Sequence, residues 1–461
     1  MLKRYIGDRA FYRRAMAVAV PIIIQNAITN VVSLLDNVMV GHVGTLQMSG
    51  VSIVNQLIFI FNLSIFGANA GAGIFTAQFH GNKDPLGVRY TFRYKCILCS
   101  LLVAAWCAVL LLADTPLINL YLLGEGNAAD AAAILAYGKE YLQIAVWGLF
   151  PFAICHAYSG TLRETGNTVV PMIGSTVAVF VNLILNFVLI FGVPGIPAMG
   201  VQGAALATVI ARFTELAIVA GWTHLNGKKC PFIQGAFRSL YVPGKLLGSV
   251  IRKGSPILIN EFLFATGLAV TNQCYSTCGL DVVPAMNINN TIWSLTSMAY
   301  VAVGNSVGII LGQMLGAGDD EATVRDANRK LSAISIAAGI LFGGISAACS
   351  QLFPLLFKTT PEVAHLAGEL IFISAVMIPF NAYVHAAYFT LRSGGKTGIT
   401  FLFDCGFMWG TLVPLAFILS RFTDLPIVPL YFICQLAEVV KCFAGYLMVR
   451  SGIWIQNLTK Q

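Results

Sequence analysis

Residues 26–44 read NAITNVVSLLDNVMVGHVG and place a single carboxylate, Asp36, inside a run that is otherwise long and apolar enough to cross a membrane. A carboxylate in hydrocarbon costs at least ~2.5 kcal/mol on insertion scales, so such residues usually face a bundle interior or an aqueous path and belong to an ion or proton relay. An acid near a helix end can instead reach out to the membrane interface. We favour the relay, which makes Asp36 the first candidate functional residue.

The composition of the chain agrees with this membrane location. Of its 461 residues, 57% are hydrophobic and only 10% are charged, whereas about 25% charged residues are usual in soluble domains. A bilayer core ~30 Å thick is spanned by roughly 20 apolar residues. Twelve runs of this kind are present, and they predict an all-α integral membrane protein with twelve transmembrane helices. The runs lie at about 15–40, 50–79, 95–113, 139–162, 168–191, 200–223, 254–278, 287–315, 331–353, 365–392, 399–420 and 428–450.

The basic residues are distributed unevenly over the loops. An even number of spans places both termini on one side, and if that side is the cytoplasm, the inner segments hold 23 of the 28 Lys and Arg residues, the outer segments three and the spans two. Cytoplasmic loops carry an excess of Lys and Arg. We therefore predict a multi-pass protein of the cell membrane with both termini in the cytoplasm. Topology then explains the net charge of +8, which gives no reason to propose nucleic acid as a partner.

The chain contains an internal repeat. An offset of 235 aligns 16–84 with 251–319 without a gap, and an offset of 229 aligns 162–168 with 391–397. Two six-helix halves follow from this repeat. Among the matched pairs are Pro21 and Pro256, Asn37 and Asn272, Asn55 and Asn290, Gln78 and Gln313, and Gly81 and Gly316.

The repeat predicts the domain organisation. Six spans are an even number, so both halves enter the membrane in the same sense and form parallel repeats with a substrate path between them. We expect an N-terminal bundle at 1–223, a cytoplasmic linker at 224–253 and a C-terminal bundle at 254–461. The matching prolines, Pro21 and Pro256, are expected to break the same helix in both halves, which would free backbone carbonyls and allow bending where neighbouring helices can satisfy the backbone.

Four motifs, in the context of twelve spans and two repeats, resemble the multidrug and toxic compound extrusion (MATE) family, whose larger group also contains lipid-linked oligosaccharide flippases. The resemblance covers essentially the whole chain. It implies a V-shaped pair of helical bundles that exports organic cations in exchange for sodium ions or protons, and we expect a monomer. The motifs are Asp36-x-x-Met39-Val40-Gly41-x-Val43-Gly44, Ala77-Gln78-x-x-Gly81, the Leu-Arg-x-x-Gly loops at 162 and 391, and Asn182-x-x-x-Asn186-x-x-x-Ile190-Phe191-Gly192.

Polar residues at one depth of the N-terminal bundle form the candidate cation-coupling site. Asp36, Asn186 and Thr208 all fall in the outer half of their spans at ~1.5 Å per residue, and Asn182 lies one turn from Asn186 on the same face. A carboxylate, two amides and a hydroxyl could bind a proton or a dehydrated sodium ion. Interhelical hydrogen bonding, worth ~0.6 kcal/mol per pair, would explain the amides and the hydroxyl but not the acid.

A second candidate group lies in the C-terminal bundle and serves substrate binding or coupling. Many family members carry Asp where this chain has Asn186, and the branch with Asn there adds carboxylates in the seventh and tenth spans. Glu261, five residues after Pro256, fits the seventh-span acid, whereas the tenth-span position is the uncharged Asn381. This departure favours protons over sodium, with a sodium ion at Asp36 or Glu261 as the alternative. Asp404 is either an interfacial anchor or a substrate contact.

Two further pairs of intramembrane charges are predicted to be structural. Arg212 with Glu215, and Glu438 with Lys441, are opposite charges three residues apart in the sixth and twelfth spans. Residues at this spacing are neighbours on a helix surface. We therefore expect each pair to neutralise itself.

Three classes of function remain, and the first is a secondary exporter of small amphipathic, mostly cationic compounds. A flippase for a lipid-linked sugar would need basic residues along its cavity, and here nearly every Lys and Arg is assigned to a loop. A membrane-embedded enzyme is disfavoured because the sequence has no phosphate-binding glycine loop, zinc-protease motif or nucleophile elbow. We expect no catalytic residues, no cofactor apart from the coupling ion, and no dedicated metal centre.

Overall fold

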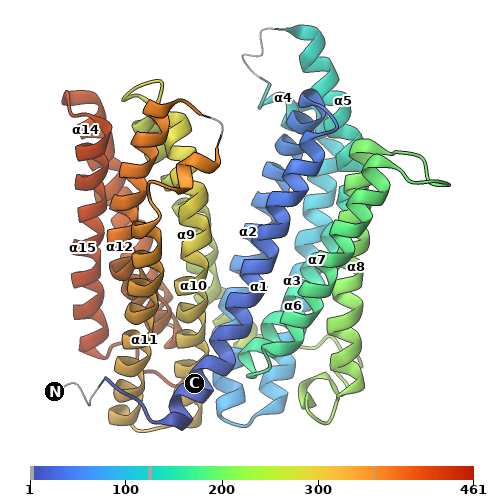
Figure 1. The fold of residues 1–461 in the computed structure, drawn as a ribbon. Helices are drawn as coiled ribbons and strands as arrows, with labels where there is room; N and C mark the ends of the chain where they lie inside the picture. The colour runs from blue at the N-terminus through green and yellow to red at the C-terminus, as the bar shows by residue number, and fades with distance from the viewer. Residues whose placement is uncertain (1–4, 123–126, 358, 461) are drawn as a thin grey trace. The chain divides into compact units, whose positions relative to one another are not determined.

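The computed structural model describes residues 5–122, 127–357 and 359–460, without the side chains of 31–38. The described chain is built from helices (Figure 1), and its one β-bridge joins Val193 and Ile196. The long apolar runs therefore form helices, as predicted. The longer elements are α1 (Arg9–Gly41), α2 (Thr45–Gly81), α3 (Pro85–Leu112), α5 (Ala128–Ala145), α6 (Leu149–Glu164), α7 (Val169–Phe191), α8 (Gly200–Leu225), α9 (Gly244–Ser276), α10 (Val282–Ala317), α11 (Glu321–Ala348), α12 (Pro361–Ser393), α14 (Val413–Phe422) and α15 (Ile427–Ser451). The short elements are α4 (Asp114–Asn119), η2 (Val146–Gly148), η3 (Pro231–Ile233), η4 (Phe353–Leu356), α13 (Thr397–Phe401), η5 (Leu402–Gly406) and η6 (Met408–Leu412).

The number of spans agrees with the sequence. Within the described residues, eleven helical stretches are long and apolar enough to cross a membrane, and α1, with 33 residues, is a further long helix. Several helices begin well before their apolar windows. The fourth span, expected at 139–162, is a continuous helical stretch from Ala128 to Glu164. A hydropathy window detects the part of a helix inside hydrocarbon, whereas the helix itself extends into the interface.

The two matching prolines do not end their helices, so the expected breaks are wrong. Pro21 lies inside α1, and Pro256 lies inside α9. Proline removes one backbone hydrogen bond, but neighbouring helices and local adjustments can satisfy the freed carbonyl in a membrane helix. Each helix is therefore continuous through a position that lacks one internal bond.

The chain divides into two compact units. Unit 1 comprises Met1–Ile23, Ala77–Asp84 and Ser249–Gln461, and unit 2 comprises Ile24–Thr76 and Pro85–Gly248. In unit 1, α12 packs against α10, α11 and α15; in unit 2, α8 packs against α5, α6 and α7. The first part of α1 and the end of α2 thus belong to unit 1 together with the C-terminal half. Unit 1 therefore contains residues from both repeats.

Equivalent residues of the two repeats meet inside unit 1. A Cβ built on Gly81 would lie 1.9 Å from the carbonyl oxygen of Gln313, and a Cβ built on Gly316 would lie 1.9 Å from that of Gln78. The ends of α2 and α10 approach this closely because glycine has no side chain. The contact is reciprocal, as at a two-fold axis, and it joins pairs that the offset of 235 aligned.

The C-terminal segment packs against the same crossing. Gln78 is fully buried, its amide donates to the Ser393 carbonyl at 2.9 Å, and its Oε1 accepts from the Leu458 amide at 2.7 Å. Trp454 is also fully buried and donates from Nε1 to the Val449 carbonyl at 3.0 Å. The residues after α15 therefore cover the crossing of α2 and α10.

Candidate functional site

Three of the four predicted coupling residues in the N-terminal half form one hydrogen-bonded chain. The Asn186 amide donates to Asn182 Oδ1 at 3.2 Å, and the Asn182 amide donates to Thr208 Oγ1 at 3.3 Å. Thr208 in turn donates to the Ala204 carbonyl at 3.1 Å. The chain joins α7 to α8, and the two asparagines are buried, with 7% and 2% exposed. The fourth residue, Asp36, lies on α1, and its side chain is outside the described residues.

A second polar network lies in the C-terminal half and surrounds Asp404. Its Oδ1 accepts from Lys441 Nζ at 2.8 Å, and its Oδ2 accepts from the Asn260 amide at 2.9 Å. The Lys441 and Asp404 side chains are 5% and 15% exposed. The network joins three segments: α9, η5 and α15. Asp404 is therefore bonded to side chains of α9 and α15 inside unit 1.

The predicted pairing of Lys441 along its own helix is wrong. Lys441 pairs with Asp404 on η5 and not with Glu438 one turn earlier on α15. Asp404 lies in the first of two π-helical stretches, η5 and η6, and π-bulges frequently occur at functional sites. The other predicted pair does form, since Arg212 Nη1 lies 3.4 Å from Glu215 Oε2 on α8.

Aromatic rings surround the Lys441 ammonium. Its Nζ lies 5.7, 5.5 and 5.6 Å from the ring centroids of Phe264, Phe403 and Phe407. A cation within about 6 Å of a ring centroid is attracted by the ring's negative face. One carboxylate and three rings thus bind this ammonium group, which is the chemistry that recognises organic cations.

The other predicted residues of the C-terminal half lie on α9 and α12. Glu261 is half-buried beside Asn260, and its charged and polar neighbours are Arg392, Asp404 and Tyr388. Asn381 is also half-buried, and its backbone carbonyl lies 2.9 Å from His385 Nδ1. Among the described hydrogen bonds, none joins the Asn381 amide to Glu261 or Asp404. Glu261 is therefore next in sequence to Asn260, which bonds Asp404, whereas Asn381 has no described bond to either acid.

Basic residues also lie inside unit 2, where the sequence assigned them to a loop. Lys95 is 1% exposed on α3, pairs with Glu164 on α6, and donates to Thr161 Oγ1 at 3.3 Å. Arg93 is 8% exposed and donates from Nε to the Ala236 carbonyl at 2.6 Å. The loop assignment is wrong because α3 begins at Pro85, before the apolar window at 95. Both cations are neutralised or bonded locally.

Metal binding finds no support in the described side chains. Among them, no group of three or more His, Cys, Asp or Glu residues lies close enough to hold a metal ion. The side-chain oxygens in the chain of Asn182, Asn186 and Thr208 belong to two amides and one hydroxyl. The Asp404 network contains one carboxylate.

Comparison with known proteins agrees with this architecture and extends it. The family model described as MatE matches residues 21–188 and 256–418, one match in each repeat. The chain is 26% identical over 449 residues to the probable multidrug resistance protein NorM of Thermotoga maritima, covering 96% of this chain and 93% of that protein. It is 25% identical over 423 residues to the probable multidrug resistance protein YoeA of Bacillus subtilis, covering 88% and 87%. A mutant of the Vibrio cholerae MATE transporter VcmN has a similar fold, with a TM-score of 0.83, 18% identity and coverage of 98% and 99%.

Two matching halves built from long apolar helices indicate an integral membrane protein. The chain belongs to the MATE family, because the family model matches well over half of its residues. It is accordingly a multi-pass membrane protein that binds small-molecule substrates, and it is not an enzyme. The resemblance noted from the motifs is confirmed.

Proposed function

We propose that this transporter is a secondary active exporter of small amphipathic, mostly cationic compounds, driven by protons or sodium ions that enter in exchange. It works as a monomer in the cell membrane, with both termini and the 224–253 linker in the cytoplasm. The names of the two relatives as multidrug resistance proteins support export of drugs. The uneven distribution of 28 Lys and Arg residues supports the orientation.

The coupling site we propose comprises Asp36 with Asn182, Asn186 and Thr208. The observation that carries it is the directed chain of hydrogen bonds from Asn186 through Asn182 to Thr208. These groups supply amide and hydroxyl dipoles in a buried place, where an entering proton or sodium ion needs partners. Asp36 alternates between a protonated, neutral state and a charged state. In the charged state its carboxylate binds a cation or contacts neighbouring helices.

The driving force is adequate for export. Each charge that crosses the membrane potential contributes ~2.3 kcal/mol per 100 mV, and a tenfold concentration ratio corresponds to ~1.4 kcal/mol. Protonation of Asp36 releases its partners, and α1 can then bend near Pro21, where one backbone hydrogen bond is missing.

In the C-terminal half, we propose that Glu261 recognises the cationic substrate. Asp404 is already paired with Lys441 and bonded to Asn260, so a substrate must compete with a tethered ammonium for it. Glu261 lies beside this network without a close ion pair among the described contacts. Since Asn381 has no charge, a sodium site here would depend on Glu261, and we favour protons as the coupling ion.

No specific observation favours a flippase. The buried Lys95 and Lys441 are each paired with an acid, and the buried Arg93 donates to backbone carbonyls. These three cations therefore do not supply the free positive lining that a phosphate-linked sugar would need. A lipid-linked substrate therefore remains the alternative of lower merit.

Transport in proteoliposomes tests the proposal. The purified protein is reconstituted, and accumulation of a fluorescent organic cation is driven by an imposed pH gradient or, separately, by a sodium gradient. We expect accumulation with the pH gradient, a strong loss in Glu261→Gln, and no loss in Glu362→Gln, whose carboxylate is exposed in the first turn of α12. Transport that needs neither gradient, or a Glu261→Gln variant with unchanged transport of every cation, would contradict it.

A further inference from the structure

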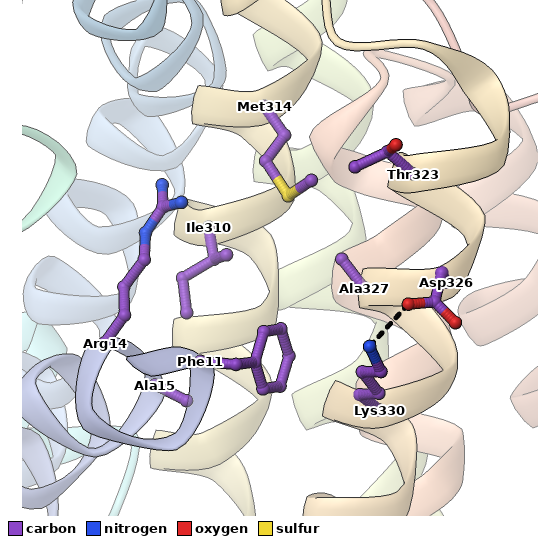
Figure 2. Close-up of a pocket in the computed structure, with 9 residues that line it drawn as sticks. All are labelled: Phe11, Arg14, Ala15, Ile310, Met314, Thr323, Asp326, Ala327 and Lys330. Atoms are coloured by element: carbon purple, nitrogen blue, oxygen red, sulfur yellow. Dashed lines mark ion pairs between the residues drawn. The ribbon is translucent and has the colours of Figure 1, made fainter. Parts of the chain in front are cut away.

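A small pocket opens in unit 1 between the first turns of α1 and the facing turns of α10 and α11 (Figure 2). Its volume is about 170 Å³. One part of its lining is apolar and is formed by Phe11, Ile310 and Met314. Arg14 lies on the α1 side of the pocket, and Lys330 with Asp326 lies on the α11 side (Figure 2). An apolar wall between two cations is the lining expected for an amphipathic anion.

The charges of the pocket do not cancel. Lys330 Nζ lies 2.6 Å from Asp326 Oδ2 and 5.7 Å from the ring centroid of Phe11, so its charge is balanced. Arg14 is exposed, and its described contact is one hydrogen bond from Nη2 to Gln313 Oε1 at 3.1 Å. A guanidinium has five N–H donors and no acceptor. Arg14 therefore provides a net positive charge and donors that remain available to a ligand.

The pocket lies near the end of α10, where a lipid headgroup could reach it. Met314 is three residues from the last residue of α10, Ala317, which at ~1.5 Å per residue is about 5 Å from the helix end. The 36 residues of α10 extend over roughly 54 Å, more than the ~40–45 Å of a whole bilayer with its headgroups. A helix of this length, centred in the bilayer, would place both of its ends in or beyond the headgroup region.

We propose that this pocket binds the phosphate-bearing headgroup of an anionic phospholipid. The phosphate lies against Arg14, and the glycerol and first methylenes cover Phe11, Ile310 and Met314. Basic pockets between transmembrane helices bind anionic lipid headgroups. With both termini in the cytoplasm, as proposed above, the lipid comes from the inner leaflet.

The size of the pocket excludes the transported compound as its occupant. Drug-sized ligands occupy pockets of about 300–1,000 Å³, whereas this one has about 170 Å³. That is the volume of roughly five or six waters in the liquid, enough for a phosphate group with its nearest atoms. The acyl chains then remain in the bilayer. Free inorganic phosphate would engage Arg14 but would leave the apolar wall uncovered.

The bound lipid has a structural consequence for α1. Phe11 and Arg14 lie in the part of α1 that belongs to unit 1, whereas residues from Ile24 onward belong to unit 2. A headgroup between Arg14 and α11 fastens the start of α1 to α10 and α11. It thereby fixes one end of the helix that carries Asp36.

Native mass spectrometry of the purified full-length protein tests the proposal. Delipidated protein is titrated with phosphatidylglycerol, with phosphatidylcholine and with inorganic phosphate. We expect retained phosphatidylglycerol adducts and binding of phosphatidylglycerol that is about tenfold weaker in Arg14→Gln, the change expected for one charge-assisted hydrogen bond. Arg13→Gln is the matched control, because Arg13 is the adjacent exposed arginine and does not line the pocket. Its affinity should equal that of the unaltered protein.

Three outcomes would overturn the proposal. An equal loss of phosphatidylglycerol affinity in Arg14→Gln and Arg13→Gln would mean that the general basic charge of this segment, and not the pocket, binds the lipid. Equal affinity for phosphatidylcholine would mean that the headgroup charge is not recognised. Complete displacement of phosphatidylglycerol by millimolar phosphate would define an inorganic-anion site. If Arg14→Gln is not monodisperse, Lys330→Gln replaces it, since that change leaves Asp326 uncompensated in the pocket and should weaken phosphatidylglycerol binding in the same way.

Discussion

The Lys441 ammonium lies 2.8 Å from the Asp404 carboxylate and joins α15 to the π-helical segment η5. Three aromatic rings lie around the ammonium, and Asn260 bonds the second carboxylate oxygen. Burial of an ion pair carries a desolvation penalty that its attraction only partly offsets. Each partner therefore depends on the other, because either charge left alone would be buried without compensation.

Removing one member of this pair is expected to be costly. Lys441→Met leaves the Asp404 charge buried, and breaking a buried pair in this way destabilises by about 3–5 kcal/mol. The additional change Asp404→Asn should recover much of the loss. Thermal unfolding in detergent measures both variants. Lys139→Met is the control, since Lys139 forms a more exposed pair with Asp114 at 3.4 Å and should cost at most about 1 kcal/mol. If the double variant, with Lys441→Met and Asp404→Asn, unfolded at a lower temperature than Lys441→Met alone, the two residues would not be energetically coupled.

The hydroxyl of Thr208 is expected to affect transport more than stability. Thr208→Val removes the acceptor of the Asn182 amide, and an interhelical hydrogen bond of this kind contributes only ~0.6 kcal/mol. Gradient-driven transport should nevertheless fall several-fold. Thr214→Val is a matched control on the same helix, because Thr214 also bonds the carbonyl four residues earlier, at 2.9 Å. Similar transport by the two variants would show that Thr208 has only a packing role.

The crossing of α2 and α10 should not tolerate a side chain. Gly316→Ala places a Cβ against the Gln78 carbonyl, so the helices must separate, and overpacking of this kind typically costs about 1–3 kcal/mol. In Gly344→Ala, the new methyl meets no atom within 4 Å, and the better helix propensity of alanine should be neutral or stabilising by up to about 1 kcal/mol. Melting temperatures of the two variants provide the comparison. A Gly316→Ala protein as stable as Gly344→Ala would mean that the helices are further apart.

The orientation of the chain can be tested in intact cells. A cysteine at the exposed position 228 in the linker should react with an impermeant thiol reagent only after the cells are permeabilised. Arg421→Cys is the outside control, because Arg421 lies in a segment predicted to face outward. Labelling at position 228 from outside the cell would reverse the proposed topology.

Much of the helical architecture could be predicted from the sequence, because bilayer thickness sets the length of an apolar run and a repeat imposes the same helices twice. The contact of Asn182 with Asn186 follows from their spacing of four residues on one helix. Thr208 was predicted from its depth alone, and the structure brings it to Asn182 at 3.3 Å. Depth in the membrane and helical spacing are therefore sufficient to predict contacts between side chains when the partners lie on two regular, adjacent helices.

The Asp404 network could not be predicted in this way. Lys441 had a suitable acid, Glu438, at helical spacing, but its partner lies 37 residues away in the sequence. Asp404 lies in the π-helical stretch η5, which contacts α15, and no residue pattern indicated this stretch. Asn260 could have been considered, because it is an amide beside Glu261 in an apolar span. Lys95 was missed because it stands at the first residue of the apolar run and was counted with the basic residues of the preceding loop, whereas α3 begins ten residues earlier, at Pro85.

The role of Asp36 is the central claim, and transport by Asp36→Asn tests it most directly. The asparagine mimics the protonated carboxyl, so the variant should fold and insert at normal levels but should not accumulate an organic cation in proteoliposomes under an imposed pH gradient. Asp281→Asn, at an exposed acid between α9 and α10, should transport like the unaltered protein. Accumulation by Asp36→Asn at the rate of the unaltered protein, with equal amounts reconstituted, would contradict the account and reduce Asp36 to a structural acid.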